Sequence, residues 1–152
     1  MHQSAGINIG YGHTKIRTAN DYVAFPSIAH PANRNFSGLG LDRRSRIVSY
    51  KGIDYEVGQD AKLVSKQLSG GKVLRPRWLD TVQYRVFQQA TFDILHEQGK
   101  ADTPWTLVTG VAVEHSKDPD YLNRLQAAWV GEHRTTVICQ SFGRTVSWVL
   151  VG

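Results

Sequence analysis

The first 26 residues contain three short apolar segments separated by two turn signals, and no other stretch limits the possible folds as strongly. Glycine tolerates positive φ values, so Gly10-Tyr11-Gly12-His13 predicts a tight turn between the first two segments. Asn20-Asp21 predicts the second turn, and Pro26 ends the third segment because proline has no N–H for a strand ladder. The result is a predicted antiparallel meander with strands at residues 5–10, 14–18 and 22–25.

The longest periodic segment predicts a helix from Trp78 to Gln98. Apolar residues recur along it at helical spacing, and Gly99 is a suitable end. A second helix should begin at Asp118-Pro119, because proline favours the first helical position and Asp120 lies near the positive end of the helix dipole. The final segment, Ser141 to Val151, predicts a third helix.

Two further segments predict strands that extend the N-terminal sheet. Trp105–Val113 is nearly all apolar or small, as in a strand buried on both faces, and Thr135–Cys139 is rich in β-branched residues. The strand–helix–strand order implies right-handed crossovers and parallel pairing. The predicted fold class is therefore α/β, with a mixed five-stranded sheet of three antiparallel and two parallel strands and with flanking helices.

An insertion at about residues 29–77 interrupts this plan. Its pattern alternates apolar and polar residues around Lys51-Gly52, which is a hairpin signature. The predicted elements of the insertion are strands Arg46–Tyr50 and Asp54–Val57 and a short helix, Gln59–Leu68.

Composition restricts the class of protein. The chain has 152 residues, enough for one domain, and 41% of them are hydrophobic, enough for a packed core. A single cysteine, Cys139, excludes an intrachain disulfide and fits a reducing compartment. No apolar stretch approaches the ~20 residues that a membrane helix needs. The N-terminus has no signal-peptide pattern, so we expect a cytoplasmic protein that does not bind membranes.

The glycine turn is the first candidate for chemistry. Its glycines allow backbone N–H groups to approach a phosphate closely, and such groups bind anions. Thr14 can donate a hydroxyl hydrogen bond, Lys15 can place a positive charge on the outer phosphates, and His13 can touch a phosphate from the turn. The spacing is not that of a P-loop, so the local pattern also allows a plain hairpin with an exposed lysine.

The order of motifs along the chain resembles a known superfamily. Ile7 to Lys15 is similar to the first phosphate loop of the actin, Hsp70 and hexokinase superfamily, and Phe25-Pro26-Ser27 follows at the expected place. Asp54 to Gly58, followed by Ala61, is similar to a segment of bacterial plasmid actins, and Leu107–Val113 is similar to the next strand. The resemblance spans nearly the whole chain. It is closest to segregation proteins of the ParM and StbA type, including the actin-like protein of PRTRC plasmid systems.

This resemblance implies a ribonuclease-H-like fold, that of actin domain I, with ATP and magnesium as cofactors. The acidic residue that holds magnesium through water in the family aligns with Asn8, whose neutral side chain is a weaker partner for this cation. Gln140 aligns with the residue that orients the attacking water, which makes it the implied catalytic residue. The implied phosphate-binding residues are Gly10, Gly12, His13, Thr14 and Lys15.

The resemblance also implies that residues 1–152 form the first of two domains that enclose ATP. We therefore expect the N-terminal half of an actin-like ATPase of plasmid partition, which self-associates into filaments in the full-length protein. A partition adaptor is a candidate partner, and this chain alone should hydrolyse ATP poorly.

The net charge of +5 leaves an alternative function open. The same fold could serve as a non-catalytic basic module that binds nucleic acid through Arg43, Arg44 and Arg46. The basic residues are scattered and few aromatic residues surround these arginines, so direct nucleic-acid binding is the weaker of the two hypotheses.

Overall fold

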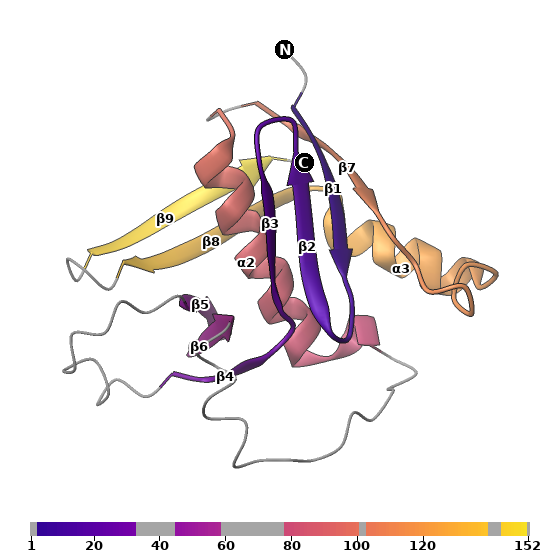
Figure 1. The fold of residues 1–152 in the computed structure, drawn as a ribbon, viewed down its shortest axis with the longest axis horizontal. Coiled ribbons are helices and arrows are strands. Elements are labelled where there is room, and N and C mark those ends of the chain that lie inside the picture. The colour runs from indigo at the N-terminus through magenta and orange to yellow at the C-terminus, as the bar shows by residue number, and fades with distance from the viewer. Residues whose placement is uncertain (1–2, 33–44, 59–77, 101–102, 140–143, 152) are drawn as a thin grey trace.

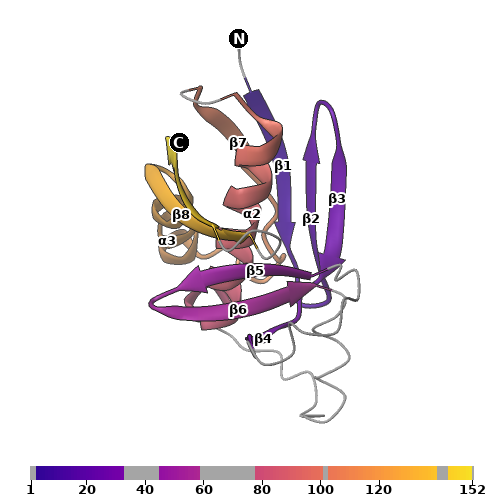
Figure 2. The same cartoon turned by 90° about the vertical axis from the view of Figure 1, so that its left-hand side faces the viewer.

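The computed structural model describes residues 3–32, 45–58, 78–100, 103–139 and 144–151. They form two β-sheets with a long helix, α2, between them (Figures 1 and 2). No described helix is long and apolar enough to span a membrane. The strands are β1 (Gln3–Ile9), β2 (His13–Thr18), β3 (Tyr22–Pro26), β4 (Ala29–Pro31), β5 (Ser45–Tyr50), β6 (Ile53–Gly58), β7 (Trp105–Thr109), β8 (Glu132–Cys139) and β9 (Arg144–Val151). The helices are η2 (Trp78–Asp80, a 3-10 turn), α2 (Val82–Gln98) and α3 (Pro119–Trp129).

The first sheet has the order β3-β2-β1-β7 and contains the predicted meander. β1 pairs antiparallel with β2, which pairs antiparallel with β3, whereas β7 pairs parallel with β1. The meander and the parallel strand that joins it are therefore confirmed. The turn from Gly10 to Gly12 lies at one end of this sheet, where β1 leads into β2 (Figure 1).

The two faces of the first sheet differ in burial. Side chains alternate along each strand, and one set packs beneath α2 around Ile7, Ile16 and Phe87, which are at most 4% exposed. On the other face, the outward residues of β2 and β7 are exposed, and Val108 reaches 69% exposure. The prediction that the strand at 105–113 is buried on both faces is therefore wrong for the described residues. That strand also ends earlier than predicted, at Thr109.

The long helix forms close to where its periodicity predicts. Trp78 begins a 3-10 turn, and α2 itself starts after Thr81, whose hydroxyl accepts the N–H of Tyr84 at 3.2 Å and caps the helix. Gly99 ends α2, as predicted, and its N–H donates to the carbonyl of Leu95 at 2.9 Å. The N-terminal end of α2 lies beside the turn of the first sheet (Figure 1).

The second sheet contains the predicted hairpin. β5 and β6 pair antiparallel, and Lys51 and Gly52 connect them with φ values of 48° and 78°. Two successive positive φ values are the signature of a type I′ turn, which matches the twist of paired strands. The predicted helix Gln59–Leu68 lies outside the described residues.

The predicted five-stranded sheet is wrong in its last strand. β8 does not lie beside β7 but belongs to the second sheet, whose order is β4-β6-β5-β8-β9. In the antiparallel register with β5, Val48 is the partner of Val137, and β8 pairs along its whole length with β9. Strand–strand partners depend on long-range pairing that the local pattern does not encode.

A groove of about 230 Å³ lies between β7 and α3. It is lined by Trp105, Leu107, Thr109, Leu122, Leu125, Gln126, Trp129 and Val130.

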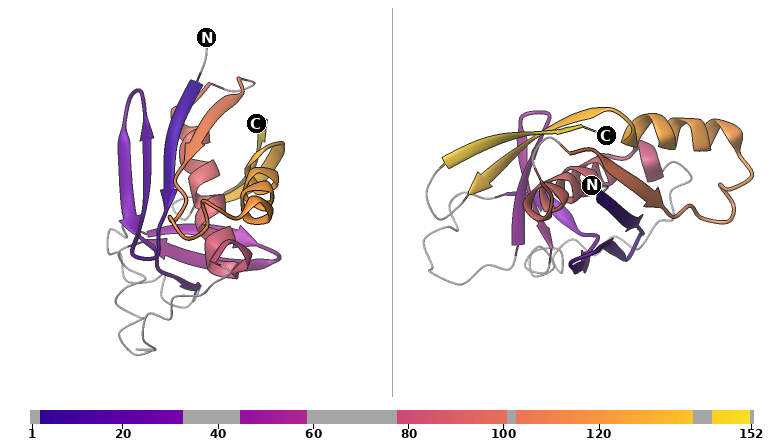
Figure 3. Two further views of the ribbon diagram at one scale, coloured as in Figure 1. Left: turned by 90° about the vertical axis from the view of Figure 1, so that its right-hand side faces the viewer. Right: turned by 90° about the horizontal axis from the view of Figure 1, so that it is seen from above.

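The predicted C-terminal helix is also wrong, because Arg144–Val151 is a strand. Five of its eight residues are β-branched or aromatic, which favours a strand over a helix. The helix predicted to begin at Asp118-Pro119 is confirmed: the Asp118 carboxylate accepts the N–H groups of Asp120 and Tyr121 at 3.0 and 3.2 Å. Seen from above, α3 and the β8–β9 hairpin extend to opposite sides of α2 (Figure 3).

Candidate functional site

The turn between β1 and β2 is closed by backbone hydrogen bonds. The N–H of Gly10 donates to the carbonyl of His13 at 3.1 Å, and the N–H of Ser27 donates to the carbonyl of Gly12 at 3.0 Å. A Cβ atom at Gly12 would meet nothing within 4 Å, so this part of the turn is open to a bulky group. The turn is thus fixed by its neighbours and accessible from outside.

Asn8 and Lys15 face each other across β1 and β2 next to this turn. They are Cα partners in the antiparallel register, and both are exposed on the face opposite α2. Side chains at such positions lie within reach of one another. On its other side Asn8 approaches the residue that follows β7: its amide carbon lies 3.8 Å from where a Cβ of Gly110 would be. An exposed cation and a neutral amide therefore share one end of the open sheet face, and His13 is exposed on the same face.

Thr14 lies on the opposite side of the sheet from Lys15. It is fully buried, and its hydroxyl is 3.0 Å from the hydroxyl of Ser27. Alternation along β2 separates the two residues, since neighbours in a strand point to opposite faces. Thr14 therefore connects the turn to the end of β3, away from the exposed pair.

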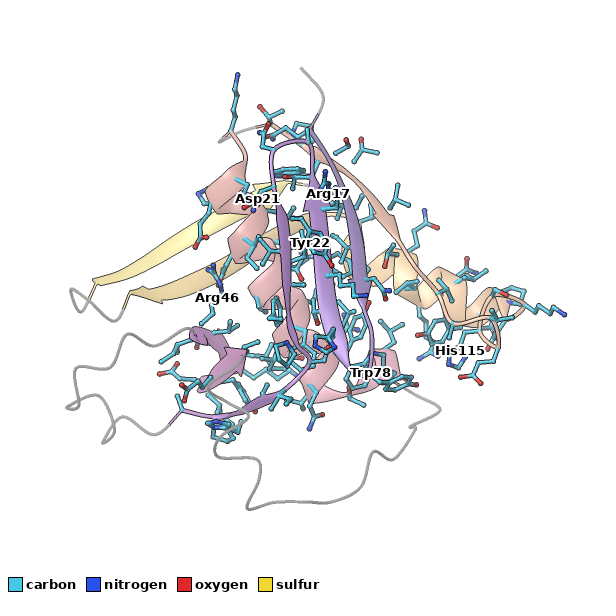
Figure 4. The ribbon with its side chains drawn as sticks, viewed as in Figure 1. Arg17, Asp21, Tyr22, Arg46, Trp78 and His115 are labelled. Atoms are coloured by element: carbon cyan, nitrogen blue, oxygen red, sulfur yellow. The ribbon has the colours of Figure 1, made fainter. Side chains whose placement is uncertain are left out.

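The aromatic residue Trp78 supports the turn from beneath. Its indole N–H donates to the carbonyl of Ile9 at 3.0 Å, and its ring lies 4.9 Å from the ring of Tyr11. In Figure 4, Trp78 lies at the end of the sheet where β1 turns into β2. Sequence reasoning missed this contact, because Trp78 is 69 residues from Ile9 and only the fold brings them together.

The segment after β7 carries a negative charge, that of Glu114, which acts on a side chain of the turn. Burial raises the pKa of the Tyr11 phenol, and the negative charge of Glu114 raises it further. Burial also raises the pKa of the Tyr121 phenol, with the nearby Tyr11 as the next cause. Tyr11 is therefore partly buried against Trp78 of η2, and the phenols of Tyr11 and Tyr121 lie close enough to influence each other.

The residues at this site suit a phosphate better than a protein-held metal. An exposed lysine and a turn without side-chain bulk at Gly12 provide the charge and the access that a phosphate requires. Asn8 offers only a neutral oxygen, and within the described ranges no three His, Cys, Asp or Glu side chains gather as metal ligands. Magnesium in such sites keeps several waters and is held largely by the phosphates of its nucleotide.

The structure describes only one of the remaining predicted site residues, Arg46. Gln140, the predicted catalytic residue, lies outside the described residues, as do Arg43 and Arg44. Arg46 is described and binds Glu97 of α2 through both of its terminal nitrogens, at 2.7 and 2.9 Å. Ser27 was predicted only as part of a motif, and the structure adds its contacts with Gly12 and Thr14.

Comparisons with known proteins agree with this architecture. Residues 6–148 match the family model described as the N-terminal domain of actin-like proteins. No curated protein sequence matches the chain significantly. Among solved structures, the chain is similar to an AlfA filament bound to AMPPNP, with 21% identity and a TM-score of 0.63 over 100% of this chain and 53% of that one.

Two further structures show the same similarity of fold. The AlfA filament from a Bacillus subtilis plasmid, pLS32, has 21% identity and a TM-score of 0.63, with 99% of this chain and 54% of that chain covered. A 15-stranded ParM filament from Clostridium botulinum has 21% identity and a TM-score of 0.67, with 97% and 45% covered. The chain spans about half the length of these relatives. It belongs to the actin-like proteins, and residues 6–148 correspond to the N-terminal domain of that family.

Proposed function

We propose that this chain is the nucleotide-binding N-terminal part of a filament-forming, actin-like ATPase of the plasmid-segregation type. The observation that carries the proposal is the exposed pair of Asn8 and Lys15 beside the glycine turn. Support also comes from the family match and from the fold shared with an AlfA filament bound to the nucleotide AMPPNP.

In this proposal, Lys15 places its positive charge on the outer phosphates, and the turn from Gly10 to Gly12 admits them closely. His13 lies on the same exposed face and is a second candidate contact. Thr14 acts indirectly, because its buried hydroxyl fixes Ser27 and with it the turn. Gln140 would orient the attacking water in the full-length protein, where a second domain encloses the nucleotide.

The alternative of nucleic-acid binding through Arg43, Arg44 and Arg46 has less support. The guanidinium of Arg46 forms a bidentate contact with the carboxylate of Glu97, at 2.7 and 2.9 Å. An arginine held in this way is less available to a phosphate backbone.

The test is calorimetric titration of Mg-ATP into the wild-type chain, Lys15→Ala and Arg17→Ala. A hydrogen bond to a charged group contributes about 1.5–3 kcal/mol, so Lys15→Ala should weaken binding by about ten- to a hundredfold. Arg17 is the matched control, because it is exposed on the same face of β2, about 7 Å farther from the turn. Its replacement should change affinity less than about twofold.

Equal losses in both variants would mean that the nucleotide responds only to general positive charge, and the proposed site would be wrong. Duplex DNA titrated at two salt concentrations tests the alternative. Tight DNA binding that weakens steeply with salt, without measurable Mg-ATP binding, would favour the nucleic-acid module.

A further inference from the structure

We propose that Trp78 is a positioning residue for nucleotide binding, which holds the Gly10–Gly12 turn in the conformation that receives the phosphates. This inference rests on the proposed function, because it assigns a role in forming the same phosphate site. Trp78 does not touch the exposed pair Asn8 and Lys15; it would act through the backbone of the turn and through Tyr11.

The first contact fixes the start of the turn. The indole N–H of Trp78 donates to the carbonyl of Ile9 at 3.0 Å, in partly buried surroundings. Ile9 is the last residue of β1 and immediately precedes Gly10. A partly buried carbonyl that loses its donor is left incompletely hydrogen-bonded, so this bond favours one orientation of the Ile9–Gly10 peptide.

The second contact fixes the middle of the turn. The rings of Tyr11 and Trp78 are 4.9 Å apart and inclined at 39°, within the range of favourable aromatic pairs. Tyr11 lies between two glycines, which are free to adopt many backbone conformations. Its side chain therefore restricts a segment that would otherwise be mobile, and Trp78 provides the surface on which it rests.

The indole itself is held by the start of α2. Its ring packs against Phe87 and Tyr84, with centroids 6.1 and 6.0 Å away. The carbonyl of Trp78 accepts the hydroxyl of Thr81, the N-cap of α2, at 2.7 Å. At the other end of η2, Asp80 binds Arg124 of α3 at 2.6 Å. Trp78 thus connects the turn to rigid elements, and a site formed before its ligand arrives loses less entropy on binding.

The experiment compares Trp78→Phe with Tyr84→Phe. Phenylalanine at position 78 keeps an aromatic ring but removes the N–H that binds Ile9. Tyr84→Phe is the matched control: it keeps its ring beside Trp78 and loses a different buried bond, from the indole N–H of Trp129 at 2.9 Å. Both variants should lose some stability, but only Trp78→Phe should release the turn.

Two readouts distinguish positioning from a structural role. Amide hydrogen exchange without ligand should accelerate about tenfold at Gly10 and Ser27 in Trp78→Phe, and remain near wild type there in Tyr84→Phe. Calorimetric affinity for Mg-ATP should fall about fivefold in Trp78→Phe and stay within twofold in Tyr84→Phe.

The outcomes separate this inference from the proposed function. If Trp78→Phe binds Mg-ATP as tightly as wild type while Lys15→Ala does not, the positioning role is wrong and the phosphate site stands. The positioning role is also wrong if hydrogen exchange at the turn accelerates equally in both variants. If the wild-type chain does not bind Mg-ATP at all, the proposed function fails and this inference fails with it.

Discussion

At the scale of single residues, the alternation along β2 assigns neighbouring side chains to opposite faces of the sheet. Lys15 is exposed beside Asn8, whereas Thr14 is fully buried and pairs with Ser27. The lysine is therefore accessible to an anion, and the threonine stabilises the turn that presents it. A sequence motif of adjacent threonine and lysine thus serves two purposes because a strand separates the two side chains.

Gly99 provides a test of packing at the residue scale. A Cβ atom there would lie 2.5 Å from the Trp105 ring and 2.9 Å from the Leu95 carbonyl, closer than real contacts allow. We predict that Gly99→Ala lowers the free energy of unfolding by about 1–3 kcal/mol, the usual cost of overpacking. Gly6→Ala is the control, since a Cβ at Gly6 meets nothing within 4 Å. Urea denaturation measures both; equal losses would contradict the close approach of α2 and β7.

At the scale of elements, two side-chain bonds join α2 to α3. The indole N–H of Trp129 donates to the Tyr84 hydroxyl at 2.9 Å, and the amide of Gln88 donates to the Ala128 carbonyl at 2.7 Å. Tyr84 and Trp129 are both buried. This contact holds α3 against the core on the side of the first sheet where α2 packs.

The Tyr84 contact predicts how stability changes at high pH. Burial is the largest cause that raises the pKa of Tyr84, from 10.0 to about 12. The unfolded chain then releases the phenolic proton at a lower pH than the folded chain. The contribution of the neutral Tyr84 phenol to the free energy of unfolding is fully present below about pH 10. It is lost as pH rises toward 12, at up to about 1.4 kcal/mol per pH unit.

Urea unfolding at several pH values between about 9 and 11 measures this loss. Tyr84→Phe should show a shallower decline than wild type, whereas Tyr22→Phe, at a half-exposed position, should decline in parallel with wild type. Identical slopes in wild type and Tyr84→Phe would show that this phenol ionises normally.

Local signals explain which elements could be predicted from the sequence. Both helices follow apolar periodicity and end groups such as Gly99 and Pro119, and the β5–β6 hairpin follows from Lys51-Gly52. Arg144–Val151 was predicted wrongly as a helix, because a short apolar run fits either state by periodicity alone. Its β-branched content was the signal for a strand.

At the scale of the whole molecule, long-range pairing limited the prediction. β8 lies between β5 and β9 and not beside β7, and no local pattern distinguishes β5 from β7 as its neighbour. The candidate site also combines local and long-range features. The glycine turn and Lys15 are neighbours in the sequence and could be predicted together, but the contact of Trp78 with Ile9 becomes visible only in the folded structure. The resemblance to a family supplied part of the missing long-range information, because the order of several motifs along the chain indicates the actin-like proteins without knowledge of any contact.

The central claim is that the turn of an actin-like N-terminal domain binds nucleotide phosphates beside Lys15. The most direct measurement is a titration of the ¹⁵N-labelled chain with Mg-ATP, followed by amide NMR signals. We predict that the signals of Gly10, Gly12 and Lys15 shift progressively in wild type, and that the signals of Gly10 and Gly12 remain in place in Lys15→Ala at the same concentrations. Shifts confined to the β5–β6 hairpin, or signals at the turn that do not respond to Mg-ATP, would contradict the claim.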